Sequence, residues 1–153
     1  MSTSTTTHSA TRGARGERAP AQLFALVAGA TLVLVGLVGF AADASFDTGS
    51  GVDGGSLIGF EVNGIHNLVH IASGLLLLAG ARRPGSARTV CLIFGITYGL
   101  VTVIGLIDGE TVLGLIPVNP ADNVLHIGLT VLALAFALMQ GRDRSTAADR
   151  RVL

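Results

Sequence analysis

Four long apolar segments dominate this sequence and limit what it can fold into. They cover residues 21–42, 63–81, 87–107 and 121–140. A helix needs about 20 predominantly apolar residues to cross the ~30 Å hydrocarbon core of a bilayer, and these segments lack the alternation of membrane barrel strands. Charged residues make up only 13% of the chain, about half their usual share in a soluble domain. The sequence therefore predicts an all-α, polytopic membrane protein with four transmembrane helices.

The charged residues are sorted between the connections. The basic residues, all of them Arg, occur only before the first segment, after the second and after the fourth: Arg12, Arg15, Arg18, Arg82, Arg83, Arg88, Arg142, Arg144, Arg150 and Arg151. Cytoplasmic connections carry an excess of basic residues. We therefore expect both termini on the cytoplasmic side of the inner (plasma) membrane. The polar tails, residues 1–20 and 141–153, are expected to be disordered there, on either side of a membrane domain at 21–140.

The first apolar segment has a second interpretation. Arg18, the apolar run and the "ADA" of residues 42–44 resemble a secretory signal with a small-residue cleavage site. However, the run is longer than the ~7–15 residues of a usual signal core. We therefore expect it to remain in the protein as a helix.

A polar triplet occurs twice, at the start of the second and fourth segments. Asn63, Asn67 and His70 recur 56 positions later as Asn119, Asn123 and His126. Asn is a favoured N-cap, and Pro120 suits a first helical position, so Asn63 and Asn119 are predicted to cap these helices. The repetition predicts two tandem helical hairpins that arose by duplication.

The remaining triplet positions share a helix face with the cap, so their side chains point in one direction. Polar groups at that depth face the bundle interior rather than lipid. We expect one polar cluster at the outer ends of helices two and four, made of Asn63, His66, Asn67, His70, Asn119, Asp122, Asn123 and His126.

Several roles are open for this cluster. Hydrogen bonds between helices would make the protein structural or accessory, which is the favoured interpretation. A metal ion could bind His66, His70, Asp122 and His126, and small solutes or protons could pass along the cluster. Haem between His70 and His126 is disfavoured because the outer side has no Arg or Lys for its propionates. No cofactor is therefore predicted.

Other motifs narrow the class of protein. No catalytic motif or phosphate-binding loop is present, so no enzyme is predicted, and no basic outer surface is available for nucleic acid. Small residues one turn apart let membrane helices approach closely. The glycines expected at such contacts are Gly29, Gly36, Gly39, Gly95 and Gly99. The predicted partner is the lipid bilayer, with a homo-oligomer or other membrane proteins left open.

Three motifs resemble a known family. They are "NGIHNLVHIASGLLLL" at 63–78, "FGITYGLVTVIGL" at 94–106 and "LGLIPVNPADNVLHIGL" at 113–129. Together they are similar to small bacterial four-helix membrane proteins catalogued as domain of unknown function 4383, over residues 23–139. The resemblance implies a fold and a membrane location, with no activity. The shared residues are Asn63, His66, Asn67, His70, Gly95, Tyr98, Gly99, Asn119, Asp122, Asn123 and His126.

Overall fold

The structure, a computed structural model, describes residues 18–149, the last eight of them by their backbone alone. Four helices make up most of this part of the chain: α1 (Pro20–Gly39), α2 (Gly64–Gly80), α3 (Pro84–Asp108) and α4 (Pro120–Asp149). Two short antiparallel hairpins precede α2 and α4: β1 (Gly55–Leu57) with β2 (Phe60–Val62), and β3 (Thr111–Val112) with β4 (Ile116–Pro117). The fold is therefore mostly helical rather than all-α.

The β1–β2 hairpin is not predicted from the sequence, because its strands have only three residues each. Its two turn residues, Ile58 and Gly59, both have positive φ, at 53° and 90°. This is the backbone of the type I′ turn, whose twist matches that of paired strands. Ile is an unusual residue in that conformation, so the turn could not be predicted from its residue types.

Three helices are long and apolar enough to cross a membrane: α1, α3 and the part of α4 from Pro120 to Gly141. The fourth, α2, is apolar but has only 17 residues. At 1.5 Å per residue it is about 26 Å long, against a hydrocarbon core of ~30 Å. Length and composition together indicate a membrane protein with at least these three spans.

Helix α4 continues to Asp149, beyond the predicted end at residue 140. The residues after Gly141 include Arg and Ala, which favour helices, and no Pro or further Gly interrupts them. Much of the region expected to form a disordered tail at 141–153 is therefore helical. The rest of that tail, and residues 1–17 of the other, lie outside the described residues.

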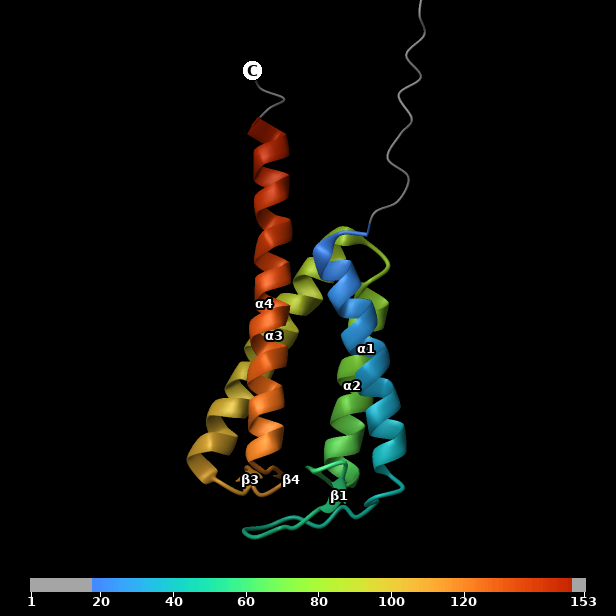
Figure 1. The fold of residues 1–153 in the computed structure, drawn as a ribbon, viewed down its shortest axis with the longest axis vertical. Coiled ribbons are helices and arrows are strands. Elements are labelled where there is room, and N and C mark those ends of the chain that lie inside the picture. The colour runs from blue at the N-terminus through green and yellow to red at the C-terminus, as the bar shows by residue number, and fades with distance from the viewer. Residues whose placement is uncertain (1–17, 150–153) are drawn as a thin grey trace, which may run out of the picture.

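The helices form two antiparallel pairs (Figure 1). Helix α1 packs mainly on α2, and α3 packs mainly on α4. The start of α1, the α2–α3 turn and the C-terminal end of α4 lie toward one end of the molecule, and both hairpins lie at the other. This second end is called the hairpin end below.

Glycines allow close contact within each pair. A methyl group on Gly29 would lie 2.9 Å from the Gly74 carbonyl oxygen, and one on Gly74 would lie 2.6 Å from that of Gly29. Gly36 and Gly39 approach α2 at Asn67, while Gly95 and Gly99 approach α4 at Leu134 and Thr130. All five glycines expected at helix contacts therefore face the partner helix of their own pair.

The two pairs bury equivalent positions. In α1 and α3, buried residues correspond at a spacing of 66: Ala21 with Ala87, Ala25 with Cys91, Ala28 with Phe94, Gly29 with Gly95, Leu32 with Tyr98, Gly36 with Thr102 and Gly39 with Gly105. In α2, with its C-cap Ala81, and in α4 they correspond at a spacing of 56: His66 with Asp122, Asn67 with Asn123, His70 with His126, Leu77 with Ala133 and Ala81 with Ala137. Most of the buried positions of the two pairs therefore correspond.

The distribution of polarity is that of a protein in lipid. Large apolar side chains are exposed along the helices, for example Leu34 at 61%, Ile96 at 65% and Val124 at 70%. Small and aromatic residues form the core away from the hairpin end, where Phe24 packs on Phe94 and Phe136 with ring centroids 6.2 and 5.8 Å apart. The buried polar residues gather mainly at the hairpin end.

Candidate functional site

Asn63 and Asn119 cap α2 and α4, which confirms that prediction. Asn63 Oδ1 accepts a hydrogen bond from the backbone N–H of His66 at 2.8 Å. Asn119 Oδ1 accepts from the backbone N–H groups of Ala121 and Asp122 at 2.9 and 3.1 Å. Asp122 Oδ2 in turn accepts from the backbone N–H of Asn119 at 2.9 Å, which completes a capping box.

The two caps also bind across the molecule. Asn63 Nδ2 donates to the carbonyl oxygen of Leu115, beside β4, at 3.0 Å. Asn119 Nδ2 donates to the carbonyl oxygen of Gly59, in the β1–β2 turn, at 2.9 Å. Leu115 and Gly59 are themselves 56 positions apart, so the two bonds are equivalent. Asn63, which caps α2, is therefore hydrogen-bonded to the β3–β4 hairpin, and Asn119, which caps α4, is hydrogen-bonded to the β1–β2 hairpin. These two bonds hold the hairpin ends of α2 and α4 side by side.

Three buried histidines meet beneath these caps. His66, His70 and His126 are 2%, 6% and 3% exposed. Their ring centroids lie 4.4 Å (His66–His70), 5.9 Å (His66–His126) and 6.4 Å (His70–His126) apart. One ring nitrogen of each lies within 4.8 Å of those of the other two. The side chains therefore converge from α2 and α4, although the two helices are not a packed pair.

The hydrogen bond of His66 assigns its tautomer. Its Nδ1 lies 2.9 Å from the carbonyl oxygen of Glu61, which can only accept, so Nδ1 carries the proton. In the neutral ring this leaves a lone pair on Nε2. The carbonyl of Pro117 also approaches the ring, but outside hydrogen-bond geometry for Nε2. Within the described chain, His66 Nε2, His70 Nδ1 and His126 Nδ1 are buried without a hydrogen-bond partner.

Asp122 lies beside the histidines without joining them. Its Oδ2 accepts the backbone N–H of Glu61 at 3.0 Å as well as that of Asn119. The group of converging ligand atoms found among the described residues contains the three histidines alone. Asp122 is buried and interacts electrostatically with His126, so it adds negative charge next to the site.

Neither inner asparagine is hydrogen-bonded to a histidine. Asn67 Nδ2 donates to the carbonyl oxygen of Asp43 at 3.0 Å, and its side chain packs on Gly39. Asn123 Oδ1 lies against Gly105, where an added methyl group would be 2.9 Å away. Among the described residues, no hydrogen bond joins an Asn side chain to an imidazole. These residues pack the end of each helix pair, and the histidines lack the bonds expected of polar glue.

A small cavity of about 60 Å³ opens beside the histidines. It is lined by His66, His70, His126, Tyr98, Ser73, Thr97, Val69, Val101 and Ile116. The Tyr98 ring stands edge-on to His126, with centroids 5.4 Å apart. The three hydroxyl residues were not predicted to belong to the site. Thr97 and Tyr98 come from α3, whose position beside the histidines no local pattern encodes, whereas Ser73 lies on α2 itself, three residues after His70. An apolar groove of about 390 Å³ between α1 and α4 also reaches His70.

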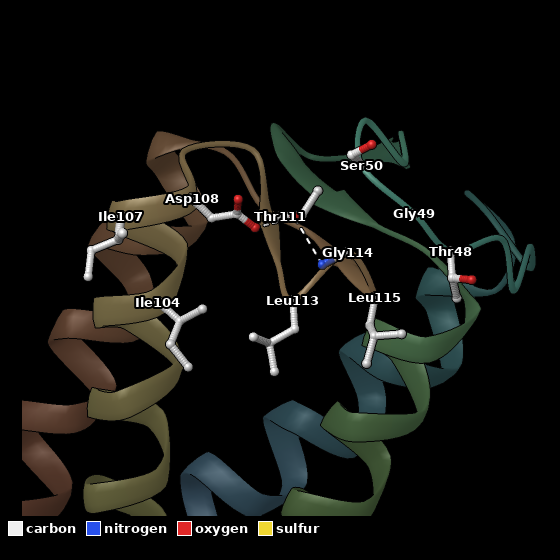
Figure 2. Close-up of a pocket in the computed structure, with 10 residues that line it drawn as sticks. All are labelled: Thr48, Gly49, Ser50, Ile104, Ile107, Asp108, Thr111, Leu113, Gly114 and Leu115. Carbon is white, nitrogen blue, oxygen red and sulfur yellow. Dashed lines mark hydrogen bonds between the residues drawn. The ribbon is translucent and has the colours of Figure 1, made fainter.

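A larger hollow of about 740 Å³ lies at the hairpin end (Figure 2). Its walls are Ile104 and Ile107 of α3, residues of the β3–β4 hairpin, and the segment from Thr48 to Ser50. The Thr111 hydroxyl donates to Asp108 and accepts from the backbone N–H of Gly114. Since these polar groups bind one another, the histidine cluster is the stronger candidate site.

Three long apolar helices and three buried histidines at the hairpin end make this a helical membrane protein with a polar interior at one end. The family model described as domain of unknown function (DUF4383) matches residues 22–139, and the chain belongs to this family. The match confirms the resemblance drawn from the three sequence motifs. No curated protein and no solved structure was found to match the chain.

Proposed function

We propose that the protein binds one divalent transition-metal ion between His66, His70 and His126. The observation that carries this proposal is the convergence of three buried imidazoles whose ligand atoms lie within 4.8 Å of one another. Zinc–nitrogen distances of about 2.0–2.1 Å place tetrahedral ligand atoms roughly 3.4 Å apart. Small side-chain rotations would therefore close the site.

The surroundings of the histidines favour a metal over polar glue. Metal-binding histidines usually donate their second N–H to a carbonyl or carboxylate. His66 does so toward the carbonyl of Glu61, which leaves the lone pair of Nε2 for a metal ion. Imidazole ligands suit Zn²⁺, Cu²⁺ and Ni²⁺, whereas Mg²⁺ and Ca²⁺ prefer oxygen. The negative charge of Asp122 nearby further stabilises a bound cation.

The finer architecture is also a proposal. α2 is taken as the fourth span, with the hairpin end outside and both termini in the cytoplasm of the inner membrane. The sidedness of the Arg residues supports this orientation. Cysteines placed at Ser50 and Ser145 test it with an impermeant thiol reagent in intact cells. Labelling is expected at Ser50 only; labelling at Ser145 without permeabilisation contradicts the orientation.

An origin of the two helix pairs by duplication of one helical hairpin supports the proposal that the two Asn-Asn-His triplets lie together. The matching buried positions of the two pairs and the reciprocal bonds of Asn63 and Asn119 favour this origin. Each copy then contributes its own histidine face, and His70 and His126 are the equivalent members.

Metal content of the purified protein tests the proposal. The full chain, prepared with an affinity tag free of histidine, is stripped with chelator, incubated with Zn²⁺, desalted and analysed for bound metal. One ion per chain is expected for the wild type and for the control His8→Ala, and a loss of binding for His66→Ala, His70→Ala and His126→Ala. Equal metal content in all five proteins would contradict the site.

A structural role is the second candidate, favoured by the reciprocal bonds between caps and hairpins. It predicts no stoichiometric metal, together with a loss of thermal stability in Asn63→Ala and Asn119→Ala. The metal analysis therefore separates the two candidates.

A further inference from the structure

The small cavity beside the three histidines gives the metal site a second component. All three imidazoles border it, and so do the hydroxyl-bearing residues Ser73, Thr97 and Tyr98. A structural zinc site is closed by four protein ligands, whereas three protein ligands leave one position for an exogenous ligand. Within the described chain, the converging ligand set has three members. The fourth position would therefore be supplied from the cavity.

We propose that this fourth position, directed into the cavity, takes a small exogenous lone-pair donor, either water or an anion of a few atoms. The inference rests on the metal site proposed above. A water molecule needs a cavity of roughly 10–15 Å³. The cavity beside the histidines measures about 60 Å³, so it admits a ligand of a few heavy atoms. A porphyrin or a carboxylic acid with a long chain does not fit there.

The chemistry of the walls selects the same class of ligand. The metal would carry two positive charges on three neutral imidazoles, which favours an anionic or strongly dipolar ligand. The hydroxyl groups can donate hydrogen bonds to such a ligand, and Tyr98 is held at the edge of the His126 ring. Val69, Val101 and Ile116 supply the apolar remainder of the wall. Tyr98 is therefore assigned as a positioning residue for the bound ligand.

The test uses the full-length protein loaded with Co²⁺, whose visible absorption reports its coordination. Azide, a three-atom anion, is titrated into the loaded protein. A saturable spectral change with one azide per Co²⁺ is expected. Tyr98→Phe removes one hydrogen bond and should weaken azide binding by about tenfold. Ser73→Leu fills the cavity and should abolish the response while Co²⁺ remains bound. Thr89→Val, which removes an exposed hydroxyl elsewhere on α3, is the matched control and should behave as wild type.

The outcomes distinguish the two proposals. If Co²⁺ does not bind, the metal site itself is wrong and this inference falls with it. If Co²⁺ binds but its spectrum ignores azide, the site is closed and only this inference is overturned. An azide response unchanged in both Tyr98→Phe and Ser73→Leu would also overturn it, because the ligand would then reach the metal by another path.

Discussion

The contact between Gly29 and Gly74 sets how closely α2, which carries His66 and His70, approaches α1. A methyl group on Gly74 would lie 2.6 Å from the Gly29 carbonyl oxygen and 2.8 Å from the side chain of Val33. Both neighbours belong to a packed helix, so Gly74→Ala must push α1 and α2 apart. Gly128 is the matched control, because a methyl group there meets nothing within 4 Å.

The expected difference between the two variants follows from these distances. Replacing Gly by Ala inside a helix stabilises it by about 0.5–1 kcal/mol, and this gain applies to both variants. Overpacking applies only to Gly74→Ala and costs about 1–3 kcal/mol. Gly74→Ala should therefore be less stable than Gly128→Ala by the overpacking term, about 1–3 kcal/mol.

Reversible unfolding of the purified protein in mixed micelles, followed by circular dichroism, measures this difference. The Gly29→Ala change disturbs the same contact, so its combination with Gly74→Ala should be less destabilising than the sum of the single variants. Equal stability of Gly74→Ala and Gly128→Ala would refute the close approach of the two helices.

Two further predictions concern the hairpin end. Asn63→Ala and Asn119→Ala should each destabilise the protein by about 1 kcal/mol through loss of the cap, with an additional effect from the lost bond to the opposite hairpin; unfolding midpoints equal to that of the wild type would contradict the reciprocal bonding. The backbone N–H of Ser45, and after it the Ser45 side chain and the Gly55 N–H, hold the pKa of the Asp43 carboxyl below its ordinary value. A carboxylate with a lowered folded-state pKa stabilises the fold above its unfolded-state pKa and loses this effect as pH falls through the folded value. Limited proteolysis of the 43–55 loop should therefore accelerate below about pH 3.8 in the wild type, and Asp43→Asn should be cleaved readily at neutral pH; a wild-type loop whose cleavage does not depend on pH would contradict the assignment.

The caps and the histidine face could be predicted because local physics determines them. Asn63 and Asn119 stand immediately before their helices, and Pro120 fits the first helical position. Helical periodicity then places His70 and His126 seven residues after the caps on the interior side. Only the position of the apolar segments and the spacing along one helix are needed for these inferences.

The correspondence between α1 and α3 could not be predicted from the 56-residue spacing that relates α2 to α4. Asn63 follows Gly39 by 24 residues, whereas Asn119 follows Gly105 by 14 residues. The first connection is therefore ten residues longer, and the helices before it correspond at 66 rather than 56. Burial reveals this register, whereas glycine-rich helices with few distinctive side chains do not.

Which residues make up the histidine site could not be predicted either, because the answer depends on contacts between residues far apart in the sequence. Asp122 occupies the position equivalent to His66, and both were candidate metal ligands. In the structure the Asp122 carboxylate is engaged by backbone N–H groups, one of them from Glu61 in β2. The same Glu61 supplies the carbonyl that orients His66. Neither contact follows from sequence spacing, because each depends on where the first hairpin lies.

X-ray absorption of the zinc-loaded protein examines the tri-histidine site at the ion itself, because the spectrum reports which atoms bind the zinc. The tri-histidine site predicts a four-coordinate ion with the outer-shell scattering of three imidazoles, zinc–nitrogen distances of about 2.0–2.1 Å, and one further light-atom ligand. His126→Ala should lose the ion on desalting, and the zinc that it binds when the ion is kept in excess should show imidazole scattering lower by about one third. A spectrum dominated by oxygen ligands without imidazole scattering, or one identical in the wild type and His126→Ala, would contradict the account.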